Sequence, residues 1–226
     1  YQLYLHAGYK VGLISTIDIK VNETSYPTDL TTPDPIIINK YLANMLSEGV
    51  QYCFIEVSSH GIAQQRVAGL EFAGGIFTNL SHDHLDYHET FADYRDTKKE
   101  FFDILSYNAV ALTNQDYKNW AFILQKTKAM KHTYALKREA EFKAKILENH
   151  FEGLQLRIDE NELWSKLVGS FNAYNLLAIY GTAILLGMDK IEALKNISVL
   201  TSVAGRFQYF ISKNNCAVIV DYAHTP

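Results

Sequence analysis

The sequence contains little cysteine, no long apolar run and no excess of positive charge. Its two cysteines, Cys53 and Cys216, both lie in apolar, strand-like runs, so we expect two small buried thiols in a reducing compartment, not a disulfide framework. No run of 18 or more apolar residues occurs, so we expect neither a transmembrane helix nor insertion into a membrane. The formal net charge of −4 gives no support for a nucleic-acid partner.

The chain also lacks a phosphate-binding loop, because no Gly-Lys-Ser or Gly-Lys-Thr string occurs in it. It opens at Tyr1 inside a helix pattern, without Met or a capping residue, and stops at Pro226 just after a strand pattern. We therefore expect both ends to be cuts inside a longer protein.

The 226 residues, 48% hydrophobic and 20% charged, are typical of a soluble globular protein with one large or two small domains. Strand-like runs alternate with amphipathic helical segments, which predicts an α/β fold with a mostly parallel sheet and helices on both faces. Alternating residues between 142 and 168 predict a small antiparallel side sheet. We place a domain boundary near Ala204-Gly205, giving a main domain of residues 1–204 and the start of a second one at 205–226.

The individual elements follow from the periodicity of the apolar residues. Helices are expected at 1–6, 35–48, 90–105, 116–128, 172–186 and 190–199, and strands at 10–16, 51–57, 74–79, 108–114, 132–136, 208–211 and 217–221. The pattern predicts neither a helix nor a strand for the short segment 63–67.

Chemically versatile side chains follow two of these strands. The string Glu56-Val57-Ser58-Ser59-His60-Gly61 ends one, and Ser81-His82-Asp83-His84-Leu85-Asp86-Tyr87-His88 follows the other. In an open parallel sheet, ligands bind at the carboxyl ends of the strands. Such a dense group of His and Asp is typical of a divalent-metal site, so we predict a site at this edge.

The residues alone leave several interpretations open. His82-x-His84-x-Asp86 approaches the metal-binding pattern of metallo-β-lactamase-like hydrolases, although Tyr87 replaces the final His and alternating strands and helices do not suit that fold. Glu56 suits Mg²⁺ or a helix cap. Lys98 and Lys99, in the amphipathic helix, both look like ordinary solvated lysines.

Seven strings in order resemble the central domain of the Mur ligases, the ATP-dependent amide-forming ligases of peptidoglycan synthesis. They span about residues 10–226, and the first and third are most similar to the MurE type, which adds a diamino acid to UDP-MurNAc-L-Ala-D-Glu. The strings are residues 56–61 (EVSSHG), 64–67 (QQRV), 77–88 (FTNLSHDHLDYH), 94–98 (YRDTK), 169–175 (GSFNAYN), 204–207 (AGRF) and 221–226 (DYAHTP).

The resemblance implies a reaction in which ATP phosphorylates a substrate carboxylate and an amine then attacks the acyl phosphate, forming an amide and releasing phosphate. It implies ATP and Mg²⁺ as cofactors, with two metal sites. It also places the family's phosphate loop directly before the helix that ends at His6, so we expect the given chain to be an inactive fragment of such an enzyme.

The resemblance implies roles for individual residues. Glu56, His84 and a Lys98 carbamylated by CO₂ would be the catalytic, metal-binding group, since a carbamate turns a cation into an anionic oxygen donor. Asp83 and Asp86 would orient His84 or cap the next helix. Substrate-binding residues would be Thr31, Thr32, Ser58, Gln64 and Arg66, and ATP would be contacted by Asn175, Arg206, Asp221 and His224.

The expected partners are the UDP-MurNAc-dipeptide and a diamino acid, diaminopimelate or lysine, and the protein is expected to be a cytoplasmic monomer. The alternatives are a folylpolyglutamate synthase-like ligase, the metal-dependent hydrolase, and a non-catalytic scaffold derived from a ligase. The string at 56–60, with Gln64 and Arg66, favours the Mur ligases.

Overall fold

The computed structural model describes residues 1–81, 87–211, 214 and 216–222, and within these residues the chain divides into two compact units. Of the described residues, the first unit contains 1–80 and 87–132, and the second contains Ser81 and the residues from 133 onward. The division falls inside strand β7 (Met130–Ala135). No helix formed by the described residues is long and apolar enough to cross a membrane.

The first unit contains a four-stranded sheet in the order β3-β2-β1-β4. Its strands are β1 (Val11–Ile14), β2 (Ile19–Val21), β3 (Thr24–Tyr26) and β4 (Tyr52–Ile55). Strands β1 and β4 are parallel, with Ile14 opposite Ile55, whereas β2 and β3 extend the sheet in antiparallel fashion. Because β1 and β4 run in the same direction, the residues that follow them emerge at the same edge.

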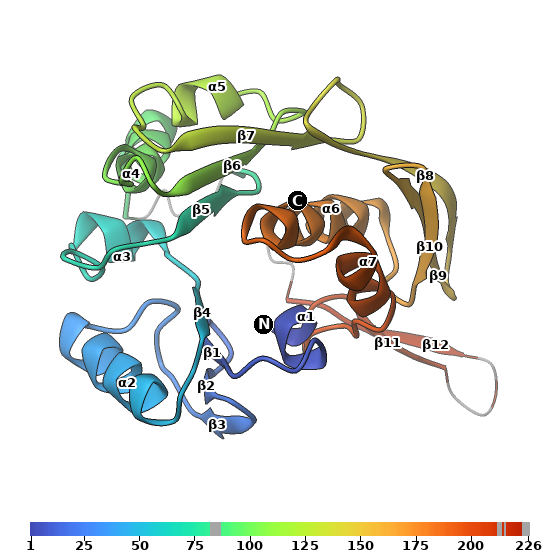
Figure 1. Ribbon diagram of the computed structural model, residues 1–226, viewed down its shortest axis with the longest axis horizontal. Helices are drawn as coiled ribbons and strands as arrows, with labels where there is room; N and C mark the ends of the chain where they lie inside the picture. Colours follow the sequence, from blue (N-terminus) through green and yellow to red (C-terminus); the bar gives the residue numbers. More distant parts are fainter. Residues whose placement is uncertain (82–86, 212–213, 215, 223–226) are drawn as a thin grey trace. The chain divides into compact units, whose positions relative to one another are not determined.

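Two helices belong to this part of the first unit, α1 (Gln2–His6) and α2 (Pro35–Ser47), and α2 runs beside the sheet (Figure 1). Helix α2 begins where the Asp34 carboxylate accepts hydrogen bonds from the first-turn N–H groups of Ile36 and Ile37. Ile38 and Met45 of α2 are buried against Ile14 of β1. A Cβ at Gly12 would lie 2.4 Å from the Met45 sulfur, so any larger residue there would require the Met45 side chain to shift.

The rest of the first unit is built on a second parallel pair, β5 (Gly74–Phe77) and β6 (Val110–Asn114). Its helices are α3 (Ser59–Ala63), α4 (Phe91–Asp103) and α5 (Trp120–Ile123). Phe101 and Phe102 of α4 are buried in one core with Phe77. This packing fixes α4 beside the strands.

Lys99 is not the solvated helix lysine that we expected. Only 6% of the residue is exposed, and its Nζ lies 2.5 and 2.7 Å from the two carboxylate oxygens of Asp103, one turn further along α4. Its ammonium also lies 5.8 Å from the centre of the Phe122 ring. The i,i+4 spacing to an acidic residue explains how α4 keeps this charge on its buried side.

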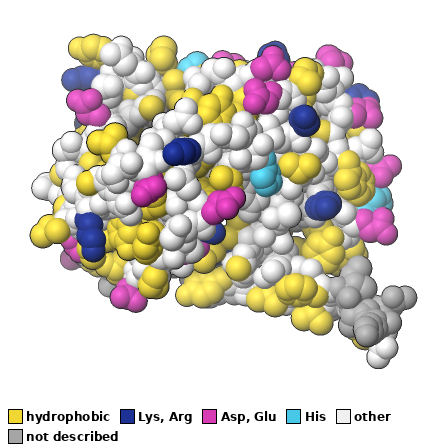
Figure 2. Space-filling model, turned by 60° about the horizontal axis from the view of Figure 1, so that its bottom comes forward, with side chains coloured by type: hydrophobic (Ala, Val, Ile, Leu, Met, Phe, Trp, Pro, Cys, Tyr) yellow, Lys and Arg dark blue, Asp and Glu magenta, His cyan; other side chains and the backbone are white. Residues whose placement is uncertain are grey.

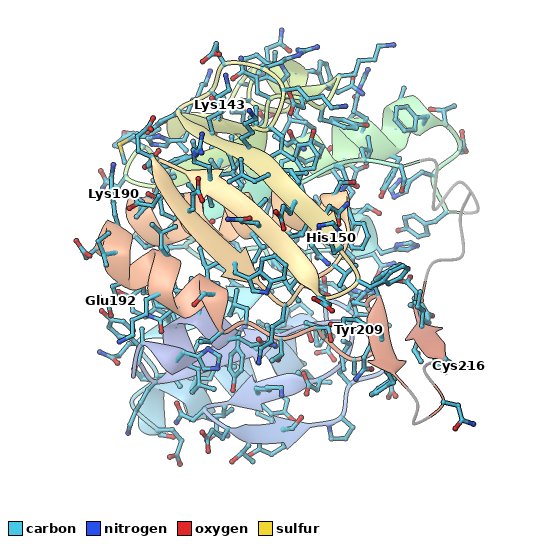
Figure 3. The ribbon with its side chains drawn as sticks, turned by 90° about the vertical axis from the view of Figure 1, so that its right-hand side faces the viewer. Lys143, His150, Lys190, Glu192, Tyr209 and Cys216 are labelled. Atoms are coloured by element: carbon cyan, nitrogen blue, oxygen red, sulfur yellow. The ribbon has the colours of Figure 1, made fainter. Side chains whose placement is uncertain are left out.

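The second unit contains the predicted side sheet. Strands β8 (Phe142–His150), β9 (Gly153–Ile158) and β10 (Asn161–Ser165) are antiparallel, and β7 joins β8 in parallel. Figure 3 looks onto this sheet, with Lys143 and His150 at the two ends of β8. Leu154, Leu156 and Ile158 alternate on its buried face, as the sequence pattern predicts.

Helices α6 (Ser170–Leu185) and α7 (Lys190–Ser198) lie beside the side sheet (Figure 1). The buried Tyr180 of α6 donates a hydrogen bond of 2.7 Å to Asp159 in the turn between β9 and β10. Lys190 of α7 forms an ion pair of 3.2 Å with the same carboxylate oxygen. The second unit ends in a separate hairpin of β11 (Gln208–Ile211) and β12 (Ala217–Val220).

The α/β class, the parallel pairs and the antiparallel side sheet are confirmed. The boundary at 204/205 stays a prediction, because the division at β7 concerns a different part of the chain. Three details of the secondary-structure prediction were wrong or incomplete. The hairpin β2–β3 was missed, and the helix predicted at 116–128 is limited to Trp120–Ile123. Helix α3 begins at Ser59, before the segment 63–67 for which no secondary structure was predicted.

The two cysteines differ in exposure, contrary to the expectation that both are buried. Cys53 in β4 is half-buried, and burial raises the pKa of its thiol to about 12, so it remains protonated at neutral pH. Cys216 is exposed.

On the face shown in Figure 2, basic and acidic side chains are interspersed, so neither sign forms a continuous patch there.

Candidate functional site

The site in the first unit begins where the parallel strands β1 and β4 end. The backbone N–H of Glu56 donates to the carbonyl of Ile14, which continues the pairing one residue beyond β4. This places the exposed Glu56 carboxylate beside Thr16. Its Oε2 accepts hydrogen bonds from the N–H of Thr16 at 2.8 Å and from its hydroxyl at 2.5 Å.

The pair Thr31-Thr32 attaches the loop before α2 to the same turn. Thr32 is fully buried; its hydroxyl donates to the carbonyl of Glu56 at 2.8 Å and accepts from the N–H of Ser58 at 2.9 Å. Oγ1 of Thr31 lies 3.1 Å from Oγ1 of Thr16. A Cβ on Gly61 would lie 2.8 Å from the Thr32 side chain, so the glycine allows this close approach.

Arg66 and Gln64 border this turn. The Arg66 guanidinium donates to the carbonyl of Thr32 at 2.6 Å, and through Nε and Nη2 to Oε1 of Gln64 at 3.0 and 2.6 Å. The other end of the Gln64 amide donates to the hydroxyl of Tyr87 at 3.3 Å. Hydrogen bonds through Arg66 and Gln64 therefore connect Thr32 to Tyr87, which belongs to the His-rich string.

A series of rings leads from Tyr87 to the helix that carries Lys98. The Tyr87 ring lies 4.0 Å from that of His60 and 5.0 Å from that of His88, measured between centroids. His88 is buried and lies 5.3 Å from Tyr94 of α4. The ammonium of the half-buried Lys98 lies 5.3 Å from the centre of the Tyr94 ring.

The structure thus joins most of the residues predicted for this edge, through direct contacts within one unit. These residues are Glu56, Thr31, Thr32, Ser58, Gln64, Arg66 and Lys98. His84 lies outside the described residues, as do His82, Asp83 and Asp86, so their predicted roles stay predictions. Among the residues that the structure describes, no three His, Cys, Asp or Glu side chains form a group suited to hold a metal ion.

The residues predicted to contact ATP belong to the second unit. Asp221 accepts a hydrogen bond of 2.7 Å from the N–H of Phe207, and Arg206 lies over the ring of Tyr222 at 5.7 Å. The exposed Asn175 donates to Asn172 within α6. Phe207 packs on Phe171, one turn before Asn175, with ring centroids 5.5 Å apart. His224 lies outside the described residues.

Sequence reasoning missed Thr16 and gave no role to Tyr87. Thr16 could have been found by the rule that selected Glu56, because both residues follow the carboxyl end of a strand. The β1–β4 register that brings them together was not predicted. Tyr87 was noted as a departure from the pattern of a hydrolase and as part of the string at 77–88, without a role of its own.

Thr32 provides a test of this geometry. Replacing it with valine keeps its shape but leaves the Glu56 carbonyl and the Ser58 N–H without their partner, so we expect unfolding to become easier by about 1–3 kcal/mol. Thr32→Ser keeps the hydroxyl and loses one methyl group, at about 0.8 kcal/mol. Urea denaturation of both variants measures the difference. Equal destabilisation by both would mean that the hydroxyl contributes nothing.

The sequence matches a family model and several curated proteins, and these matches agree with one another. The model of the Mur ligase middle domain matches residues 1–183. The UDP-N-acetylmuramoyl-L-alanyl-D-glutamate–2,6-diaminopimelate ligase of Phocaeicola vulgatus is 53% identical over the whole chain, which covers 47% of that protein. The chain spans about half the length of the curated relatives it matches.

Two solved structures are similar in fold. A 2,6-diaminopimelate ligase of the same name superposes with a TM-score of 0.86 and 26% identity, covering 99% of this chain and 47% of the other. Folylpolyglutamate synthase from Thermotoga maritima has a TM-score of 0.71 at 14% identity, covering 99% of this chain and 58% of the other, which indicates a shared fold alone.

Proposed function

Since the chain belongs to the Mur ligase family, we propose that the complete protein joins a diamino acid to UDP-MurNAc-L-Ala-D-Glu in peptidoglycan synthesis, using ATP. The single observation that carries this proposal is the 53% identity over all 226 residues to a ligase whose name specifies this reaction. That name specifies 2,6-diaminopimelate, so we propose diaminopimelate as the acceptor amino acid in preference to lysine.

The donor set around Glu56 fits a hard cation such as Mg²⁺. The carboxylate is exposed, it is hydrogen-bonded to the hydroxyl of Thr16, which in turn contacts the hydroxyl of Thr31, and no described residue donates a hydrogen bond to Oε1. Oxygen ligands of this kind suit Mg²⁺, which needs few protein carboxylates. Bound there, the ion would offset the negative charge that develops on phosphoryl oxygens. We propose Glu56 as one ligand, and His84 and a carbamylated Lys98 as ligands of a second ion.

The substrate would be held by the groups that surround this carboxylate. Arg66 has a planar guanidinium suited to a carboxylate or a phosphate, and three of its N–H groups are already oriented by Thr32 and Gln64. Thr31 and Ser58 lie next to Thr32 in the hydrogen-bonded turn. Their task is orientation, which keeps the reacting carboxylate and the incoming amine in position.

In the second unit we propose that Asn175, Arg206, Asp221 and His224 contact ATP. Arg206 and Asp221 are exposed, and the hydrogen bond from Phe207 to Asp221 holds the two segments together. The cation would face phosphate oxygens, and the carboxylate would accept from a hydroxyl of the ribose.

Neither enzymatic alternative is favoured. The similarity to folylpolyglutamate synthase concerns the fold alone, at 14% identity. The hydrolase pattern His82-x-His84-x-Asp86 lies outside the described residues, while the family match supports a ligase. We further propose a cytoplasmic monomer that depends on a phosphate loop preceding this part of the chain.

The full-length protein provides the test. With UDP-MurNAc-L-Ala-D-Glu, 2,6-diaminopimelate, ATP and Mg²⁺, we expect a product heavier than the dipeptide substrate by one diaminopimelate minus water, with one phosphate released per product. Chelation of the metal with EDTA should abolish product formation. Absence of product with either diamino acid would contradict the proposal, and preference for lysine would contradict only the choice of acceptor.

A further inference from the structure

Thr16 makes two hydrogen bonds to a single oxygen of the Glu56 carboxylate. Its backbone N–H lies 2.8 Å and its hydroxyl 2.5 Å from Oε2, across 40 positions of sequence. Hydrogen bonds to an ionised carboxylate are shorter and stronger than those between neutral groups. Two donors on one oxygen restrict the rotation of the carboxylate as well as its position.

The hydroxyl of Thr31 supports the Thr16–Glu56 contact through the hydroxyl of Thr16. Thr16 has one hydroxyl hydrogen, and the carboxylate can only accept, so that hydrogen must point to Oε2 of Glu56. The contact of 3.1 Å between the two threonine hydroxyls then requires Thr31 to donate to Thr16. A chain of hydrogen bonds therefore runs from Thr31 through Thr16 to Glu56, and it increases the donor strength of Thr16.

The two carboxylate oxygens of Glu56 therefore differ in the hydrogen bonds that they accept. Oε2 has two donors, whereas no described residue donates to Oε1, and the side chain is exposed. We propose that Thr16 is a positioning residue that holds Oε2 of Glu56 so that Oε1 is oriented toward a divalent cation. The inference rests on the proposed role of Glu56 as a metal ligand.

The test is a titration of the full-length protein with Mn²⁺, following free Mn²⁺ by electron paramagnetic resonance without nucleotide. Thr16→Val removes the hydroxyl and keeps the backbone donor, so we expect the Kd for Mn²⁺ to rise about tenfold, the lower end for groups that support a metal ligand. Thr16→Ser keeps both donors and should stay within about threefold of the wild type.

A second readout separates positioning from general loosening of the site. Affinity for UDP-MurNAc-L-Ala-D-Glu, measured without metal, should change less than about threefold in Thr16→Val, because an exposed surface substitution costs little elsewhere. Thr31→Val keeps both hydrogen bonds from Thr16 to Glu56 and loses only the strengthening by Thr31, so its Kd for Mn²⁺ should rise less than in Thr16→Val and stay within about threefold. If Thr16→Val does not fold, Thr16→Ala removes the same hydroxyl without the branched side chain.

Glu56→Gln distinguishes the two ways in which the inference can fail. Weakened Mn²⁺ binding in Glu56→Gln but not in the Thr16 variants would overturn the role of Thr16 and leave the proposed function intact. Unchanged binding in Glu56→Gln would overturn the metal role of Glu56 itself. Equal weakening in Thr31→Val and Thr16→Val would overturn the assignment of positioning to Thr16.

Discussion

Replacing Glu56 with glutamine in the full-length protein is expected to lower kcat for ATP-dependent ligation about 10³-fold. The substitution keeps the size of the side chain but removes the charge that would bind the cation, and metal ions contribute several kcal/mol of transition-state stabilisation. A loss of about 4 kcal/mol corresponds to this factor. Initial rates of phosphate release at saturating substrates measure it.

Glu48 provides the matched control, since it is an exposed glutamate at the end of α2, away from the turn that holds Glu56. Glu48→Gln should change kcat less than about twofold, as expected for a surface substitution. Circular dichroism should give the same fold for both variants. A Glu56→Gln enzyme that retains more than about a tenth of wild-type kcat would show that this carboxylate does not support the reaction.

Lys98→Met is expected to lower kcat by a similar factor, about 10³-fold. In the proposed modification, the neutral amine attacks CO₂, a new N–C bond forms, and one proton is lost, which leaves an anionic carbamate. Methionine cannot form it. Depleting the wild-type enzyme of CO₂ should therefore lower its activity, and bicarbonate should restore it. Assays in degassed buffer with and without bicarbonate measure this response.

The neighbouring Lys99 is a suitable control because it differs from Lys98 in its contacts. It is buried and paired with Asp103. Lys99→Met should lower the free energy of unfolding by about 1–3 kcal/mol, since Asp103 loses its partner. Any activity that remains should depend on CO₂ as in the wild type. Lys98→Met with wild-type activity, or a wild type indifferent to CO₂, would contradict the carbamate.

The sequence pattern predicted those parts of the fold that depend on local periodicity. Alternation at Leu154, Leu156 and Ile158 predicted a buried strand face, and the structure confirms it. The hairpin of β2 and β3 was missed because each strand has three residues and the turn between them, with Asn22 at a φ of 52°, contains no glycine. Strands this short provide too few residues for a periodic signal.

For the site, the sequence predicted which residues lie near one another better than how they contact one another. The position of Glu56 after a strand was enough to identify it as a candidate. Its hydrogen bonds to Thr16 depend on the register of β1 against β4, which pairs residues about 40 positions apart. Lys99 was misjudged because its burial depends on which side of α4 packs on the core, although Asp103 at i+4 was visible in the sequence.

If Arg66 binds the substrate as proposed, its existing hydrogen bonds would affect how the site discriminates between ligands. Three of its five N–H groups already serve Gln64 and the carbonyl of Thr32. A ligand that binds through these donors replaces their hydrogen bonds to Gln64 or Thr32. Only the difference in free energy between the old and the new hydrogen bonds then contributes to affinity. A neutral oxygen gains almost nothing over the Gln64 amide, whereas an anionic oxygen gains the stronger, charge-assisted bond. In the proposed substrate site, Arg66 would therefore favour a charged ligand group over an uncharged mimic of it.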